Sequence, residues 1–151
     1  MRFKEWIYNA GMFSYGQRIE VGQVFDNDEL SAYEKMKAAW RVLYGWNGRL
    51  MPPRLRVKMF NRMLDGLKYW ADLEKNELHY TPTAEEERAG LARLNSEVGA
   101  MGTVNALAQK FGKDPDEILR WEWAKVFGIL RTDLKEYLYN RRLSEQYTKK
   151  K

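Results

Sequence analysis

Apolar positions recur every three or four residues over most of the chain after residue 25, which is the spacing of one face of a helix. The first such stripe predicts a helix over 26–44. Asp26 and Glu29 stand three residues apart, as in a capping box, and Gly45 follows the last apolar position as a helix-ending glycine. The stripe consists of Leu30, Tyr33, Met36, Trp40 and Leu43.

The same spacing predicts a second helix over 54–76, which starts after Pro52 and Pro53. A third helix is predicted to begin at Thr83, a good N-cap with Glu86 three residues later. This helix weakens at its glycines, so a kink or break is expected there. The glycines concerned are Gly99 and Gly102.

Two more helices complete the predicted body. A short one over 104–111 ends at Gly112. The last begins with Asp114 as N-cap, Pro115 in the first turn and Glu117 closing the box, and it continues to about residue 147 with a bend at Gly128.

Residues 1–25 have a different pattern, with three glycines, closely spaced aromatics and alternating β-branched residues such as Ile19 and Val21. This pattern predicts an N-terminal arm over 1–25 with strand or hairpin tendency. The sequence therefore predicts an all-α protein: a small helical bundle of about five helices over 26–147, with this extended or hairpin arm before it and a basic tail over 148–151.

Composition restricts the chemistry. The 151 residues include no Cys and one His, His79, and no apolar run long enough to cross a membrane. The first ten residues, MRFKEWIYNA, interleave charges with aromatics and do not resemble a secretory signal. We therefore expect a soluble, intracellular protein that is not an enzyme and has no cofactor.

Two groups of residues carry side chains that chemical sites use. Asp26, Asp28 and Glu29 carry carboxylates close together, but DNDELSAYEKM lacks the glycine and the later glutamate of a calcium loop, and helix capping accounts for them. His79 has no Ser, Cys or second His arranged around it, which favours a loop or capping role. We expect no catalytic residue and no metal site.

The formal net charge is +5, and basic residues gather between residues 49 and 68. Their place in the first half of the 54–76 helix is slightly unfavourable with respect to the helix dipole, so an anionic partner is one interpretation. A solvated outer face is the other, and we favour it. The residues concerned are Arg54, Arg56, Lys58 and Arg62.

The stretch VNALAQKFGKDPDEILRW has the outline of a helix-turn-helix. A DNA-reading second helix needs basic or amide side chains in its first turns, whereas this one reads DPDEIL. We therefore favour a packing corner here, and we expect no nucleic-acid partner.

Aromatic residues are dense in WEWAKVF. On one continuous helix Trp121 and Trp123 face different directions, so one of them could meet another chain, unless the helix is buried on two sides. The candidate partner-binding residues are Trp121, Trp123, Phe127, Trp70 and Trp40.

The chain from about Gly22 to Arg142 resembles the tail assembly chaperones, small all-α proteins encoded beside the tape-measure gene of tailed phages and prophages. The resemblance lies in FGKDPDEILRWEWAKVFGILRTDLKEYLYNRR, with ELSAYEKMKAAWRVLYG and GLKYWADLEKNELHY upstream.

The resemblance implies a non-catalytic protein of the host cytoplasm that binds the tape-measure protein, keeps it soluble before the tail tube polymerises, and is then shed. It also implies a homo-oligomer and a longer, frameshifted form of the same chain as partners. Two other interpretations stay open: a structural accessory of the phage head–tail or tail, and a helix-turn-helix-like DNA-binding regulator.

Overall fold

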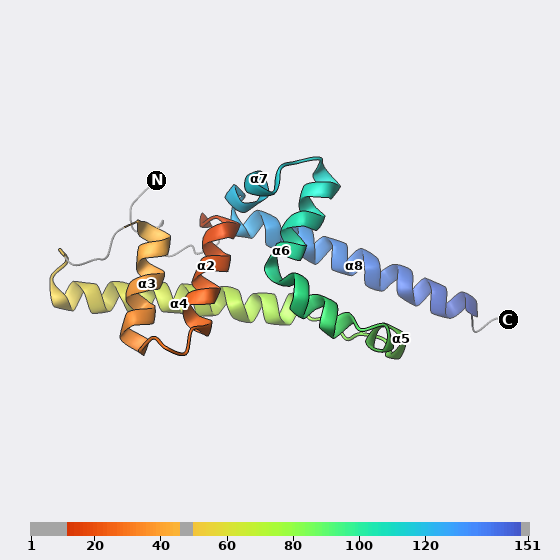
Figure 1. The fold of residues 1–151 in the computed structure, drawn as a ribbon, viewed down its shortest axis with the longest axis horizontal. Helices are drawn as coiled ribbons and strands as arrows, with labels where there is room; N and C mark the ends of the chain where they lie inside the picture. The colour runs from red at the N-terminus through yellow and green to blue at the C-terminus, as the bar shows by residue number, and fades with distance from the viewer. Residues whose placement is uncertain (1–11, 46–49, 149–151) are drawn as a thin grey trace.

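The computed structural model describes residues 12–45 and 50–148, which form seven helices and no strand (Figure 1). The all-α prediction is confirmed, although the helices outnumber the five expected. They are α2 (Tyr15–Asp26), α3 (Ala32–Tyr44), α4 (Pro53–Glu77), α5 (Ala84–Arg88), α6 (Leu91–Phe111), α7 (Pro115–Arg120) and α8 (Trp123–Thr148).

The predicted strand or hairpin over 1–25 is wrong for the part that the structure describes, because residues 15–26 form helix α2. Ser14 caps this helix: its side chain accepts from the Gln17 N–H, and the Gln17 side chain accepts from the Ser14 N–H. Two satisfied backbone donors at the start outweigh the weak helix propensity of the β-branched residues. The rest of the predicted arm, residues 1–11, lies outside the described residues.

The next helix begins later than predicted. Asp26 is the last residue of α2 instead of an N-cap, and α3 is capped by Ser31 in a capping box with Glu34. Its end at Gly45 agrees with the prediction. The helix predicted over 54–76 is confirmed as α4, and the box of Thr83 with Glu86 is confirmed at α5.

The third predicted helix is divided. The short α5 ends at Arg88, and α6 starts after Gly90. Inside α6 the backbone of Gly99 has φ 51° and ψ −150°, which bends the helix at a conformation that only glycine adopts readily. The short helix expected over 104–111 is thus the second half of α6.

The predicted last helix is also divided. Asp114 caps α7 as expected by accepting from the Asp116 N–H, whereas Glu117 pairs with Lys113 at 2.9 Å. Helix α7 ends at Arg120 with Trp121 as its C-cap, and the new helix α8 begins at Trp123. The basic tail predicted for 148–151 lies outside the described residues except for Thr148, the last residue of α8.

The break between α7 and α8 is held by the N-terminal segment. The Tyr15 N–H donates to the Trp121 carbonyl and the Trp123 N–H donates to the Phe13 carbonyl, both at 2.8 Å. These bonds form an isolated antiparallel bridge between Ser14 and Glu122. The Trp121 carbonyl and the Trp123 N–H are therefore bonded to the N-terminal segment instead of to helical neighbours, so α7 and α8 do not form one continuous helix.

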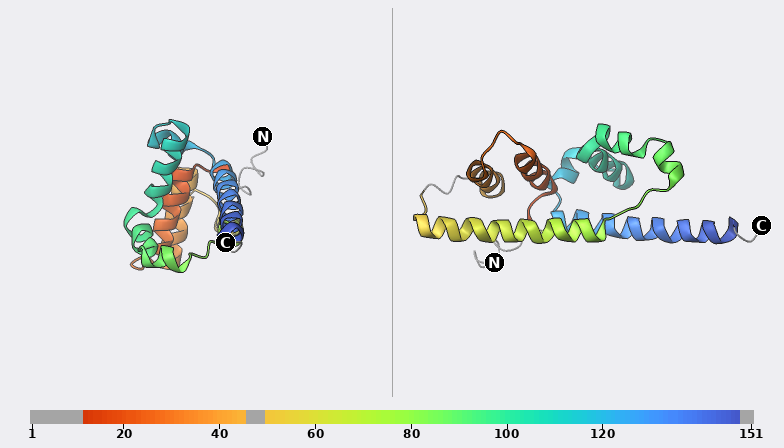
Figure 2. Two further views of the ribbon diagram at one scale, coloured as in Figure 1. Left: turned by 90° about the vertical axis from the view of Figure 1, so that its right-hand side faces the viewer. Right: turned by 90° about the horizontal axis from the view of Figure 1, so that it is seen from below.

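The two long helices give the molecule its length. At 1.5 Å per residue α4 is about 37 Å long, and α8 is of similar length. They overlap near the middle of the molecule and extend toward opposite ends (Figures 1 and 2). Helices α2 and α3 lie side by side and cross α4, while α6 and α7 stand over the start of α8.

Among the described residues, a hydrophobic cluster joins these helices. Its fully buried side chains include Trp40 of α3, Val104 of α6, Ile118 of α7 and Val126 of α8. Burial of Val104 and Ile118 on both sides of the turn supports the packing corner expected from VNALAQKFGKDPDEILRW. Gly16 lets α2 approach α7 closely, because an added Cβ would lie 3.2 Å from the Leu119 carbonyl oxygen.

Candidate functional site

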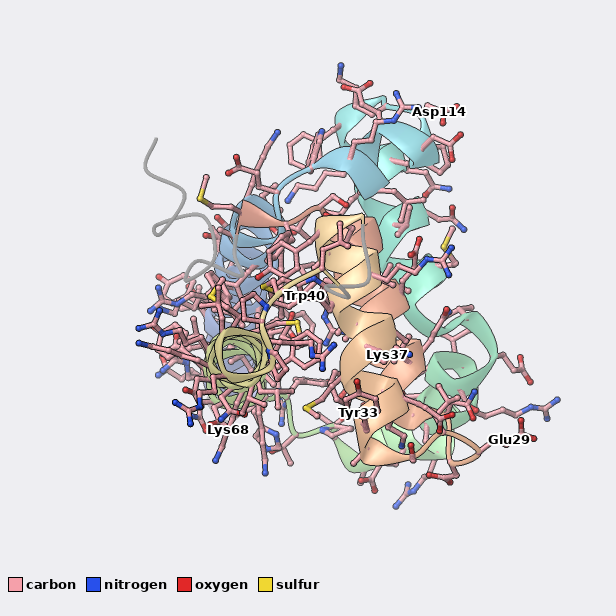
Figure 3. The ribbon with its side chains drawn as sticks, turned by 90° about the vertical axis from the view of Figure 1, so that its left-hand side faces the viewer. Glu29, Tyr33, Lys37, Trp40, Lys68 and Asp114 are labelled. Atoms are coloured by element: carbon pink, nitrogen blue, oxygen red, sulfur yellow. The ribbon has the colours of Figure 1, made fainter. Side chains whose placement is uncertain are left out.

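Three of the predicted partner-binding residues belong to the core. Trp40, Trp123 and Phe127 are 2%, 3% and 8% exposed. Trp40 lies between α3 and α4, against Phe60 with ring centroids 5.1 Å apart (Figure 3). The prediction that these three side chains are exposed partner-binding anchors is therefore corrected: they pack in the core, and only a small part of their surface reaches solvent.

The other two predicted aromatics are half-buried. Trp70 of α4 packs on Trp123 and Phe127, with ring centroids 5.4 and 5.6 Å away. Trp121 packs on Phe111, and the Lys125 ammonium lies 3.5 Å from its ring centroid. The two tryptophans of WEWAKVF differ in burial because the chain breaks between them, not because one helix turns them to different sides.

The four candidate residues for an anionic partner all lie on α4. Arg54 and Lys58 are exposed, and Arg56 and Arg62 are half-buried. Between the exposed pair, Leu55 and Val57 leave 46% and 59% of their surface in solvent. This half of α4 is therefore mixed, basic and apolar, instead of uniformly charged.

A mostly apolar pocket of about 330 Å³ opens between α2 and α4. We call it the α2/α4 pocket. Charged side chains from both helices also line it, and one of them, Lys68 of α4, is labelled in Figure 3. Its apolar lining is Val21, Gly22 and Phe25 from α2, Leu64, Leu67 and Ala71 from α4, and Trp123 from α8; its charged lining is Arg18, Asp26 and Lys68.

A polar clamp joins three helices beside this pocket. Arg18 of α2 donates from Nε and Nη2 to the Glu74 carboxylate of α4, at 3.3 and 2.6 Å. The Trp123 Nε1–H of α8 donates to the same carboxylate at 2.6 Å, and the Arg18 guanidinium lies 5.3 Å from the Trp123 ring centroid. Burial lowers the pKa of Arg18, but the hydrogen bond and charge of Glu74 outweigh it and raise the pKa above its ordinary value.

Sequence reasoning missed this pocket. The spacing of Leu64, Leu67 and Ala71 places them on one face of the helix predicted over 54–76, but the prediction of an extended arm over 1–25 gave no helix α2 to face them. The spacing of Arg18, Gly22 and Asp26, four residues apart, is the signal that could have found it, since it places all three on one helix face.

A second polar cluster attaches α5 to α8. The Glu86 carboxylate accepts from the Thr83 N–H at 2.7 Å, from the Tyr137 hydroxyl at 2.6 Å and from the Tyr80 hydroxyl. These bonds, the Thr83 N–H first, lower the pKa of Glu86 to about 2. The same carboxylate raises the pKa of Tyr80 above its ordinary value.

The attachment of α5 is expected to be lost in acid. A carboxylate with a pKa lowered from 4.5 to about 2 stabilises the fold fully above pH 4.5, and this contribution disappears as the pH falls from 4.5 through 2. Hydrogen exchange of the α5 amides, corrected for intrinsic rates, should show less protection at pH 2 than at pH 5. Glu86→Ala should already show weak protection at pH 5, because it removes the acceptor of these bonds; equal protection of the wild type at both pH values would contradict the assignment.

In the part of the chain that the structure describes, Asp26, Asp28, Glu29 and His79 do not form a metal-binding cluster. Within the described ranges, no three His, Cys, Asp or Glu side chains are placed to hold a metal ion. Asp26 ends α2, and the Asn27 side chain accepts from the Glu29 N–H at 2.9 Å. His79 is exposed, with its Nε2 at 3.5 Å from the Thr81 hydroxyl.

None of the helices in residues 12–45 and 50–148 is both long and apolar enough to cross a lipid bilayer. Large apolar side chains do remain in solvent on several of them, interleaved with charge. Those on α6 are Leu94, Val98 and Met101, which are 54%, 43% and 46% exposed.

Comparison with known protein families, with curated proteins and with solved structures found no match to this chain.

Proposed function

We propose that this chain is a non-catalytic tail assembly chaperone of a tailed phage, which binds the tape-measure protein in the host cytoplasm and keeps it soluble until the tail tube polymerises. The observation that carries the proposal is the mostly apolar α2/α4 pocket, which a folded helical scaffold leaves open. A pocket of this kind suits an apolar side chain of another polypeptide.

The apolar side chains left in solvent support the same function. Exposed apolar side chains offer surface for weak contacts with a partner, and the charged residues beside them oppose self-aggregation. They are Leu55 and Val57 on α4, and Leu94, Val98 and Met101 on α6. A chaperone that the tube protein displaces needs such contacts, because each must be weak enough to release. Several copies on one long tape-measure protein would add their weak contacts by avidity.

Co-expression tests the proposal. The tape-measure protein of the same phage is produced with and without this chain at matched levels, and its soluble fraction is measured. We expect a rise of several-fold with the chain present. No rise, with this chain itself folded and soluble, would contradict the proposal.

The composition of finished particles separates a chaperone from a structural accessory. A chaperone is shed, so mass spectrometry of purified particles should find this chain absent or far below one copy per tail ring. Retention at ring stoichiometry would show that it is a permanent part of the particle.

A further inference from the structure

The α2/α4 pocket has the size and chemistry of a receptor for one large apolar side chain. Its volume is about 330 Å³, and its lining includes the Trp123 ring, which the Glu74 clamp holds in place. Leu64 and Leu67 add aliphatic side chains from α4, and Ala71 of the same helix is small and exposed. A fixed aromatic ring among aliphatic side chains favours an aliphatic or aromatic occupant.

The charges of the lining add a second requirement. Lys68 is exposed and has no ion pair among the residues that the structure describes. Arg18, in contrast, is already paired with Glu74, and the charge of Asp26, the acidic residue of the lining, acts on Arg18. An incoming carboxylate therefore finds its available cation at Lys68.

One helix can meet both requirements. Side chains three or four residues apart lie on the same helix face, about 5–6 Å from each other at Cβ. An apolar side chain and a carboxylate at this spacing can reach the pocket and the Lys68 ammonium together.

We propose that the α2/α4 pocket binds an amphipathic helix of the tape-measure protein, which inserts one large apolar side chain over Trp123 and places a carboxylate, one turn away, on Lys68. This inference rests on the proposed function and names the part of the partner that the site recognises. Binding depends on the shape of the pocket as well as on its apolar lining. A variant whose own side chain fills the pocket should therefore fail to bind the helix, although its surface is as hydrophobic as that of the wild type.

Filling the pocket tests the apolar half of the proposal. Ala71→Trp places a large side chain in the lining of the pocket, and Ala92→Trp, on an exposed position of α6 outside the pocket, is the matched control. The tagged chain is co-expressed with the tape-measure protein, and the amount of tape-measure protein captured per chain is measured. We expect Ala71→Trp to lose about ten-fold or more in capture, as for an interface anchor, and Ala92→Trp to match the wild type.

Reversing one charge tests the other half. Lys68→Glu should weaken capture about two- to five-fold, the range of an exposed ion pair, and Lys68→Arg should restore it. Lys75→Glu, at an exposed lysine of the same helix outside the pocket, should have no such effect. Far-ultraviolet circular dichroism confirms that each variant is folded.

The outcomes separate the two proposals. If the wild type captures the tape-measure protein and both Ala71→Trp and Lys68→Glu capture as much, this inference is overturned and the chaperone function still stands. No capture by the folded wild type would overturn both. A wild-type dimer that Ala71→Trp converts to monomer, with capture unchanged, would show that a second copy of this chain occupies the pocket and would also overturn the inference.

Discussion

Trp123→Ala is expected to lower the free energy of unfolding by about 3–5 kcal/mol, the range for removing a large aromatic side chain from a core. Trp123 is 3% exposed, contacts the Trp70 ring, and donates its Nε1–H to Glu74. Its loss leaves a cavity under the α2/α4 pocket and a carboxylate with one donor fewer. Urea unfolding followed by circular dichroism measures the change.

Trp121→Ala is the matched comparison, because this tryptophan stands two residues away and is half-buried. We expect a loss of about 1–2 kcal/mol, since its ring packs mainly on Phe111 near the surface. Equal losses of unfolding free energy in the two variants would contradict the structure, in which Trp123 is buried and Trp121 is only half-buried.

Glu74→Ala is expected to cost about 2–3 kcal/mol, because it removes the acceptor that the Arg18 guanidinium and the Trp123 Nε1–H share. The side chains of Arg18 and Glu74 are 33% and 17% exposed, so water replaces the lost partner only in part. The measurement is again the free energy of unfolding in urea.

Glu77→Ala provides the control one turn further along α4. Glu77 pairs with Arg131 at 2.6 Å, but both side chains are more exposed, 34% and 44%, and we expect less than about 1 kcal/mol. The double variant Arg18→Met, Glu74→Leu should recover part of the loss of Glu74→Ala, because it leaves no unpaired charge. Equal losses for Glu74→Ala and Glu77→Ala would contradict the clamp.

Local signals predicted most of the helices correctly. The start of α4 after Pro52, the capping box of Thr83 with Glu86, and the cap at Asp114 all depend on residues within one turn of each other. Such contacts form wherever the chain is helical, so the sequence alone reveals them. Gly112, with φ 61°, ends α6 for the same local reason.

The predicted elements differ from the observed ones where local signals in the sequence conflict, or where the structure depends on contacts between distant parts of the chain. For α2, the alternation of Ile19 and Val21 favoured a strand, while Ser14 and Gln17 already carried the signal of a capping box. The break at Trp121 has no local signal, because it is fixed by hydrogen bonds to Phe13 and Tyr15, more than a hundred residues earlier in the chain.

The candidate site was predicted less well than the fold, for a related reason. Apolar periodicity indicates which side chains of a helix share its apolar face, but it does not show which other helix packs against that face. Trp40 and Trp123 therefore looked like interface anchors and are core residues, whereas Lys68 and Ala71 gain their place beside a pocket only because α2 crosses α4.

Light scattering during refolding tests most directly the claim that this protein serves to bind another polypeptide. The tape-measure protein is diluted from denaturant into buffer that contains either this chain or serum albumin at the same mass concentration. We predict that this chain suppresses the scattering in proportion to its amount until it saturates at a fixed ratio, while albumin does not. Equal scattering with the two proteins would contradict the account.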